Sequence, residues 1–334
     1  MAGELTSDAR KTRRIRWWLL IAILVAGGAL IGGLQVPDLF PDDAHRNLAT
    51  IAATLLVAGL VTLWAIFGTG RSLSFSLRSL LAVIAAAAAL VASVRVEGFS
   101  GNLWPRMTWR WTTKPDESLA VGGPRSHSAE NPAVADLSTT SGHDIPQFLG
   151  PNRDATIDAP PFPSDWSTAP PRLRWKQPIG AGWSSFAVVG DYAVTQEQRG
   201  NDECVTCYAL QSGELLWTHA DPGRFSHTLS GDGPRSTPTI DKGRVYTLGA
   251  LGRLNCLDGR TGERRWTHEI VKENKSSLPQ WGKSCSPLVV DDLVVVSAGG
   301  RNGHSLVAYD KQSGEIAWHA GDDSSSYASP RLAE

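Results

Sequence analysis

The sequence predicts transmembrane α-helices near the N-terminus, followed by an all-β domain built from repeated four-stranded units. Two observations lead to this prediction. The long apolar runs lie within the first hundred residues, and a Gly-Glu-x-x-Trp pattern recurs in the second half with a period of about 50 residues. The 334 residues hold 32 Lys and Arg against 33 Asp and Glu. This balance argues against a nucleic-acid partner, which requires a basic face.

Three apolar runs are candidates for membrane spans: Trp17 to Val36, Leu48 to Phe67 and Ser79 to Val94. A spanning helix needs about 20 apolar residues, and the first two runs meet that length. The third run reaches only about 24 Å as a helix. Arg78 and Arg95 bracket it, and their long side chains can extend to the two interfaces. We therefore expect residues 17–96 to form three transmembrane helices.

The placement of charged residues predicts the orientation of these helices. Residues 1–16 form a basic tail, the loop after the first run is acidic, and the loop before the third run is basic. Because cytoplasmic loops carry excess Lys and Arg, the tail is expected in the cytoplasm and the chain after residue 96 outside the inner membrane, in the periplasm. The residues concerned are Lys11, Arg13, Arg14 and Arg16, then Asp38, Asp42 and Asp43, then Arg71 and Arg78.

Residues 97–144 are expected to form an interfacial segment and a flexible linker. Trp104, Trp109 and Trp111 follow the last apolar run, and tryptophan favours the lipid–water interface. The alternative is that they pack on the soluble domain. From Thr112 to Asp144 the chain is rich in Pro, Gly, Ser and Thr, which predicts a tether between membrane and β domain.

Three repeats organise residues 145–334. Each carries Ser/Thr-Gly-Glu-x-x-Trp, and in the second we predict four strands separated by turns. Four strands in a period of about 40–50 residues are typical of one blade of a β-propeller. The glycine suits a tight turn, the tryptophan can bury a large surface against the next blade, and Asp258 and Asp310 are expected to cap turns. The repeat residues are Gly213 and Trp217, Gly262 and Trp266, and Gly314 and Trp318; the four predicted strands are Thr237 to Ile240, Arg244 to Gly249, Arg253 to Leu257 and Glu263 to His268.

The propeller is predicted to be incomplete in this chain. Pro171 to Lys176 has the form of an outermost, Trp-bearing strand and precedes the first full repeat. The sequence stops at Glu334 as a fourth repeat begins. Because known propellers have about 4–8 blades, we expect either a fragment, which we favour, or a chain that pairs with another.

The segment Leu257-Asp-x-x-Thr-Gly-Glu-x-x-Trp266 resembles the tryptophan-docking motif of the PQQ-repeat, or quinoprotein-like, propellers. That family includes pyrroloquinoline quinone (PQQ)-dependent dehydrogenases and the non-enzymatic propeller subunit of the outer-membrane β-barrel assembly machinery. Phe148 to Asp154 and Pro279 to Gly282 resemble segments of bacterial PQQ-like proteins. For the enzymes, the resemblance implies a catalytic Asp, a calcium site and a Trp beneath the quinone. No Asp of this sequence maps onto the catalytic one, so neither a catalytic residue nor a metal ligand is assigned.

The four cysteines favour a structural role. Cys204 and Cys207 form a Cys-x-x-Cys pair, but a haem site would need His at position 208, which is Tyr208. Residues i and i+3 of a strand point to opposite faces, so a bridge between the two requires a local bend. Buried free thiols are therefore expected at Cys204, Cys207, Cys256 and Cys285, with a Cys204–Cys207 disulfide as the alternative.

The residues that precede each innermost strand should gather at one mouth of the propeller channel. Two cations among aromatic rings are a candidate site for an anionic, planar or sugar-like ligand, against the alternative of ordinary rim packing. These candidates are Trp183, Arg235, Trp281, Lys283 and Tyr327.

The sequence thus favours a membrane-tethered binding or scaffold module of the cell envelope, with an envelope protein or polymer as its partner. The alternative is a membrane-bound PQQ-dependent oxidoreductase acting on alcohols or sugars, and PQQ with calcium is expected only in that case. A sensor is disfavoured because the 16-residue cytoplasmic tail is too short for a signalling domain.

Overall fold

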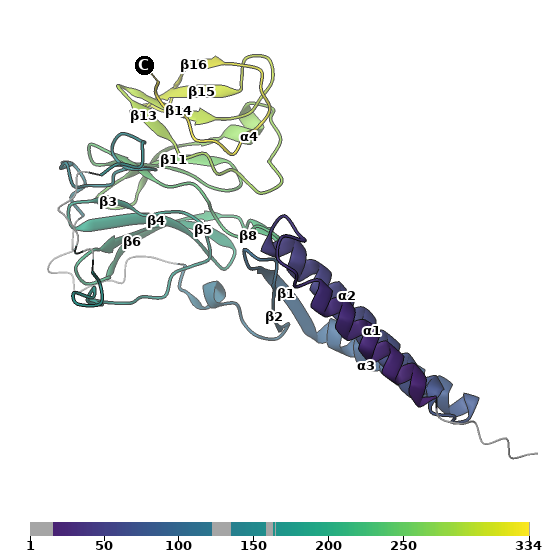
Figure 1. The fold of residues 1–334 in the computed structure, drawn as a ribbon. Helices are drawn as coiled ribbons and strands as arrows, with labels where there is room; N and C mark the ends of the chain where they lie inside the picture. Colours follow the sequence, from purple (N-terminus) through teal and green to yellow (C-terminus); the bar gives the residue numbers. More distant parts are fainter. Residues whose placement is uncertain (1–15, 122–134, 158–162, 164, 334) are drawn as a thin grey trace, which may run out of the picture. The chain divides into compact units, whose positions relative to one another are not determined.

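The computed structural model describes residues 16–121, 135–157, 163 and 165–333 (Figure 1). The chain divides into two compact units, Met1–Thr112 and Thr113–Glu334. The first unit is helical with one small hairpin, and the second is built of β-sheets. Each unit is described by itself.

Three helices make up most of the first unit: α1 (Trp17–Gly33), α2 (Asp43–Leu63) and α3 (Leu73–Ser93). A short π-helical turn, η1 (Trp64–Gly68), continues α2. Side chains cap two of these helices at their first turn, because the Asp42 carboxylate accepts from the backbone N–H of His45 and the Ser72 hydroxyl accepts from that of Phe75.

The helices pack through small residues and tryptophan. A Cβ on Gly27 of α1 would lie 2.6 Å from a methyl group of Val57 in α2, so glycine permits this close approach. The rings of Trp17 and Trp64 lie 5.3 Å apart. This packing leaves most large apolar side chains of the helices exposed.

Two stretches, Asp43–Gly68 and Leu73–Ser93, are long and apolar enough to cross a membrane by length and composition. Only 11% and 6% of their most apolar windows are buried inside the protein. Helix α1 has 17 residues and ends at Gly33, so it is shorter than the predicted first span to Val36. The third helix begins at Leu73, earlier than the predicted Ser79. Three spans therefore remain a prediction.

A β-hairpin follows α3 directly, where the sequence predicted the end of a span and an interfacial segment. Strand β1 (Val94–Phe99) pairs antiparallel with β2 (Pro105–Trp109), with a register shift between Val96 and Gly98. The predicted interfacial tryptophans lie in β2 or just beside it.

Three antiparallel four-stranded sheets dominate the second unit, and we call them blades 1, 2 and 3 (Figure 1). In each blade the strands pair in sequence order, as expected for part of a propeller. Blade 1 is β3 (Ala187–Val189), β4 (Tyr192–Arg199), β5 (Asp202–Ala209) and β6 (Leu215–Pro222); blade 2 is β9 (Thr239–Asp241), β10 (Arg244–Leu248), β11 (Arg253–Asp258) and β12 (Arg264–Glu269); blade 3 is β13 (Leu288–Val290), β14 (Leu293–Ser297), β15 (Leu306–Asp310) and β16 (Ile316–Ala320).

The four strands predicted for the second repeat are confirmed, with ends that differ by at most two residues. Among the described residues of the second unit, three small elements fall outside the blades and were not predicted: η2 (Pro115–Ser118), the hairpin β7 (Ser226–His227) with β8 (Gly231–Asp232), and α4 (Ile270–Glu273).

One docking contact recurs three times and joins the repeats. In each, an indole N–H donates to a backbone carbonyl, and the ring covers a glycine of positive φ three residues after that carbonyl. The pairs are Trp175 with Leu210 and Gly213 (2.8 Å), Trp217 with Gly259 and Gly262 (3.0 Å), and Trp266 with Lys311 and Gly314 (3.3 Å).

Two further predictions differ from the structure. The segment from Pro171 to Lys176 forms no strand, because no strand of the described ranges pairs with it, although Trp175 still donates to the Leu210 carbonyl. The predicted linker is also partly ordered. Leu137 is fully buried in the same core cluster as Trp217, and Asp116 pairs with Arg224 at 2.6 Å. Residues 122–134 of that linker lie outside the described residues.

Candidate functional site

Strands β3, β9 and β13 are the first strands of the three blades, and β9 contacts both β3 and β13. We call the loops that lead into these three strands the mouth. Of the five candidates predicted from the sequence, Trp183, Arg235 and Trp281 lie in these loops, and Tyr327, from the chain after β16, contacts Trp281. Trp281 and Tyr327 come together here: their rings stack 5.4 Å apart at 27°, and the backbone N–H of Trp281 donates to the Tyr327 hydroxyl. Both side chains are exposed, as is Trp183 at 61%.

Arg235 lies at the mouth but is committed to local structure. Its guanidinium donates to the carbonyls of Ser230, Gly231 and Gly233, which closes the β7–β8 hairpin loop. The same group lies 4.7 Å from the centre of the Phe225 ring. Burial lowers the pKa of Arg235, and the nearby Asp232 and Glu203 oppose that shift.

Lys283 does not face the mouth, in contrast to the prediction. Its side chain is fully buried, and its ammonium donates to the carbonyls of Ser297 and Ala298 and to the hydroxyl of Ser325, at 2.7–3.2 Å. Burial lowers the pKa of this ammonium to about 8. The residue turns inward because three oxygen acceptors, two in blade 3 and one in the chain after it, replace its hydration. The predicted pair of solvent-facing cations is therefore absent from the described mouth.

Arg153 is the buried cation that sequence reasoning missed. It is 3% exposed and donates to the backbone carbonyls of Ser286, Pro287 and Pro330, and to the side-chain oxygen of Gln147. Burial lowers its pKa to about 10. It belongs to the segment from Phe148 to Asp154, which the sequence singled out only for its resemblance to other proteins.

The segment carrying Arg153 occupies the inner edge of the blades. Ile145 forms a bridge with Val188 of β3, and the backbone N–H of Ile240 in β9 donates to the carbonyl of Pro146. A hollow of about 290 Å³ remains between this segment and the starts of the inner strands, lined by Phe148, Leu149, Ile157, Phe186 and others. The chain's own residues thus fill much of the space along the inner strands.

Three serines, each one or two residues before a proline, link successive blades along this edge. The hydroxyl of Ser236 accepts from the side-chain amide of Gln196, at 2.9 Å. The hydroxyl of Ser286 accepts from the backbone N–H of Thr237, and that of Ser329 accepts from the N–H of Ser286, both at 2.9 Å. These contacts explain why serine recurs in that slot.

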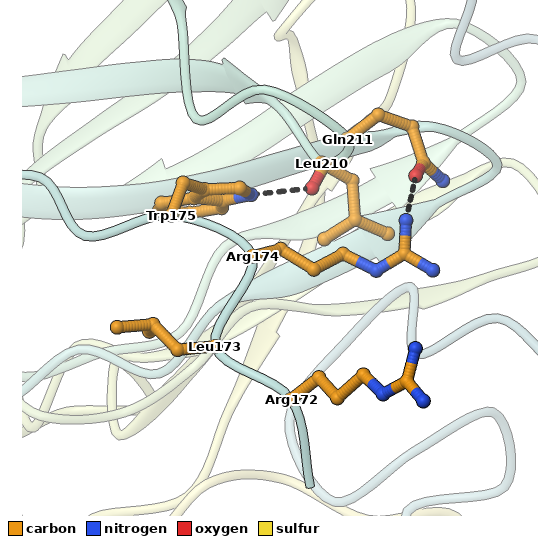
Figure 2. A pocket seen from close by; sticks show the side chains of 6 residues that line it. All are labelled: Arg172, Leu173, Arg174, Trp175, Leu210 and Gln211. Carbon is orange, nitrogen blue, oxygen red and sulfur yellow. Dashed lines mark hydrogen bonds between the residues drawn. The ribbon is translucent and has the colours of Figure 1, made fainter.

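The pocket in Figure 2 lies beside Trp175 and measures about 450 Å³. Figure 2 shows Trp175 donating to the Leu210 carbonyl and Arg174 donating to Gln211, while Arg172 and Leu173 point away from that contact. A second hollow of about 280 Å³ is also lined by Trp175, together with Ile179, Phe186, Tyr208 and others. Both border the unpaired segment 172–179 and are open, so we assign neither as a binding site.

Other titratable groups are engaged inside the sheets. Asp258 and Asp310 each accept backbone N–H bonds within their own turns. Glu197 pairs with Arg199 at 2.9 Å and accepts from the Tyr208 hydroxyl at 2.8 Å, all three buried. All four cysteines fall in the described ranges, where they are free and buried, so the alternative Cys204–Cys207 disulfide is not formed.

The described residues do not fit a PQQ–calcium site. They include no group of three or more His, Cys, Asp or Glu side chains able to hold a metal ion. The side chains of Arg235 and Lys283 already donate hydrogen bonds to backbone carbonyls of this chain. The segment around Arg153 fills the inner edge of the blades. The chemistry that the mouth offers is an exposed set of aromatic rings: Trp183, Trp281 and Tyr327.

Fold and mouth together define a repeat β protein whose blades are joined by docked tryptophans. Comparison with known families agrees: residues 201–333 match the family model described as outer membrane protein assembly factor BamB. The quinohemoprotein alcohol dehydrogenase ADH-IIG of Pseudomonas putida is 32% identical over 120 residues, which cover 33% of this chain and 16% of that relative. The repeat region of this chain is thus similar to the PQQ-repeat propeller family over residues 201–333, as its docking motif predicted.

Solved structures of the same kind resemble the chain over part of its length. A quinohemoprotein alcohol dehydrogenase from Comamonas testosteroni is 19% identical, with 56% of this chain and 30% of that chain covered and a TM-score of 0.42. BamB from Moraxella catarrhalis is 19% identical, with 42% and 48% covered and a TM-score of 0.26. The relatives therefore include both a dehydrogenase and an assembly factor.

Proposed function

We propose that this protein is a membrane-tethered propeller module that binds an envelope protein or polymer at its mouth. The observation that carries the proposal is the set of exposed aromatic rings in these loops: Trp281 and Tyr327 stack on each other, and Trp183 is exposed in the loop before β3. Aromatic side chains of this kind are enriched where proteins bind partners.

The tether is proposed to be the helical unit, inserted in the inner membrane with the propeller on the periplasmic side. Two helices of sufficient length and apolar character support this, because their side chains are mostly exposed and need an apolar surrounding. The orientation rests on the basic N-terminal tail and on the acidic loop from Asp38 to Asp43.

Photo-crosslinking in cells tests the binding proposal. A benzoylphenylalanine at position 183 is expected to give a discrete crosslinked product, and that product should be lost when Trp281→Ala is added. The matched control places the same group at Arg260, which is exposed in the outer turn of blade 2. Equal products at both positions, or a product at 183 unaffected by Trp281→Ala, would contradict the proposal.

A PQQ-dependent oxidoreductase is the second candidate, favoured by the sequence similarity to a quinohemoprotein alcohol dehydrogenase. PQQ with calcium would supply redox chemistry, but the described residues do not fit that site. Titrating the full chain with PQQ and Ca²⁺ while following tryptophan fluorescence separates the two candidates. The binding proposal predicts no saturable quenching, and calcium-dependent quenching would make the oxidoreductase the better account.

A further inference from the structure

The β1–β2 hairpin has two chemically different faces. Its register places Val94 opposite Trp109 and Val96 opposite Met107, and directly opposed residues share a face. The ring of Trp111 stacks on Trp109 at 5.2 Å and 5°, so it extends the same face. One side of the hairpin is therefore apolar between its helix-proximal end and the register shift, and we call it the apolar face.

The apolar face stays uncovered by the described residues. Met107 is 62% exposed, Trp109 48% and Trp111 70%. A two-stranded hairpin is marginally stable by itself in water, and a contiguous exposed apolar patch usually marks a contact surface. We therefore expect lipid or another molecule to cover the apolar face.

The opposite face needs no partner. Arg95 donates to the Glu97 carboxylate at 3.0 Å and to the Thr108 hydroxyl at 3.2 Å, and that hydroxyl donates to Glu97 at 2.9 Å. These three side chains satisfy one another and suit contact with water. The hairpin is thus amphipathic in the manner of an interfacial element rather than of a buried sheet.

Its attachment fixes the hairpin at one end of the helices. Helix α3 ends at Ser93 and β1 begins at the next residue, so no linker separates them (Figure 1). The backbone N–H of Arg110 donates to the Ser93 carbonyl at 2.8 Å, and the Asn47 side chain near the start of α2 donates to the Asn102 carbonyl at 3.0 Å. If α2 and α3 cross a bilayer, the hairpin lies where they leave it.

We infer that the hairpin lies in the interfacial zone of a phospholipid bilayer, with the apolar face among the upper acyl chains and the Arg95–Glu97–Thr108 face toward water. This inference rests on the proposed membrane insertion of the helices. Tryptophan favours that zone, and the exposed Arg106 can extend to lipid phosphates. Continuity with α3 favours lipid over a second copy of the chain or a soluble partner.

Spin labels on neighbouring residues test the inference. Met107→Cys reports the apolar face, Thr108→Cys the opposite face, and Leu56→Cys the exposed side of α2. Each full-length variant is labelled with a nitroxide and reconstituted in phosphatidylcholine liposomes. The native cysteines are buried, so the unmutated chain gives the background. Relaxation by oxygen, which concentrates in lipid, is compared with relaxation by a water-soluble nickel chelate.

The ratio of oxygen to nickel accessibility is expected to be several-fold higher at 107 than at 108, and high at 56. Water exposure at 107 with lipid exposure at 56 would overturn the inference and leave the anchor standing. Water exposure at 56 as well would refute the membrane insertion itself. Shielding of 107 from both reagents would identify a protein cover and also overturn the inference. Val96→Cys repeats the apolar-face measurement should Met107→Cys misfold, since the two residues are paired.

Discussion

Replacing Gly262 by alanine should weaken the docking of blade 1 on blade 2. Gly262 has φ +74°, and a Cβ there would lie 2.6 Å from the Trp217 ring. The left-handed backbone costs an alanine about 1 kcal/mol, and overpacking in a filled interior costs about 1–3 kcal/mol more. The ring is held by its bond to the Gly259 carbonyl and is 3% exposed, so it cannot move aside freely. We expect a total loss of about 2–4 kcal/mol.

Thermal unfolding of the full chain in nanodiscs, followed by tryptophan fluorescence, measures this loss. Gly190→Ala is the matched control, because Gly190 has φ +54° and its Cβ would meet nothing within 4 Å. The control should lose only about 1 kcal/mol, which corresponds to a shift of about 2–4 °C in Tm for a domain of this size. Equal losses for the two variants would refute the claim that the docked ring constrains Gly262.

Three further changes probe the interior. Trp217→Phe removes the bond to the Gly259 carbonyl and should cost about 1–3 kcal/mol in the same unfolding assay, with an unchanged melt arguing against the bond. Arg153→Met strips three backbone carbonyls of their donor and should cost about 3 kcal/mol; Arg153→Lys should recover only part of it. Burial raises the pKa of Glu203 from 4.5 to about 7. Between these pH values the folded protein keeps a proton that the unfolded chain has lost, so the free energy of unfolding should fall as the pH rises through this range. Glu203→Gln should flatten that fall by about 3 kcal/mol, and a variant with the wild-type pH profile would contradict the assignment.

The repeat domain was predictable because its sequence signal is local and recurs. Trp217 and Trp266 mark the same strand in successive blades, and the glycine turn before each is required by the docking ring. The strands of the second repeat followed from alternation and turn residues, and their ends were placed within two residues. Because the same pattern recurs in each repeat, a strand that is ambiguous in one repeat can be assigned by comparison with the others.

The candidate site was less predictable because side-chain direction depends on contacts far apart in sequence. Lys283 precedes the first strand of blade 3 as expected, yet its ammonium turns inward toward Ala298 of that blade and Ser325 beyond it. Arg153 lies more than 130 residues before the Ser286 carbonyl that it binds. Neither residue carries a local signal that distinguishes a buried structural cation from a solvent-facing one.

The linker and the hairpin show a similar limit. Composition indicated a flexible tether after Thr112, but Leu137 lies in the blade core because a few apolar residues in a polar stretch suffice to dock it. The apolar run was predicted to end at Val94, one residue after the last residue of α3, but hydropathy carries no signal that the next residues pair as a hairpin.

Topology mapping in spheroplasts tests the central claim, a propeller held outside the inner membrane by its helices. Arg265→Cys places a thiol on blade 2, where the native side chain is 57% exposed, and Arg71→Cys places one in the loop between η1 and α3. A membrane-impermeant maleimide is predicted to label position 265 in intact spheroplasts and position 71 only after lysis, with the chain in the carbonate-resistant membrane fraction. Labelling of position 71 before lysis, protection of position 265, or a chain recovered in the soluble fraction would contradict the account.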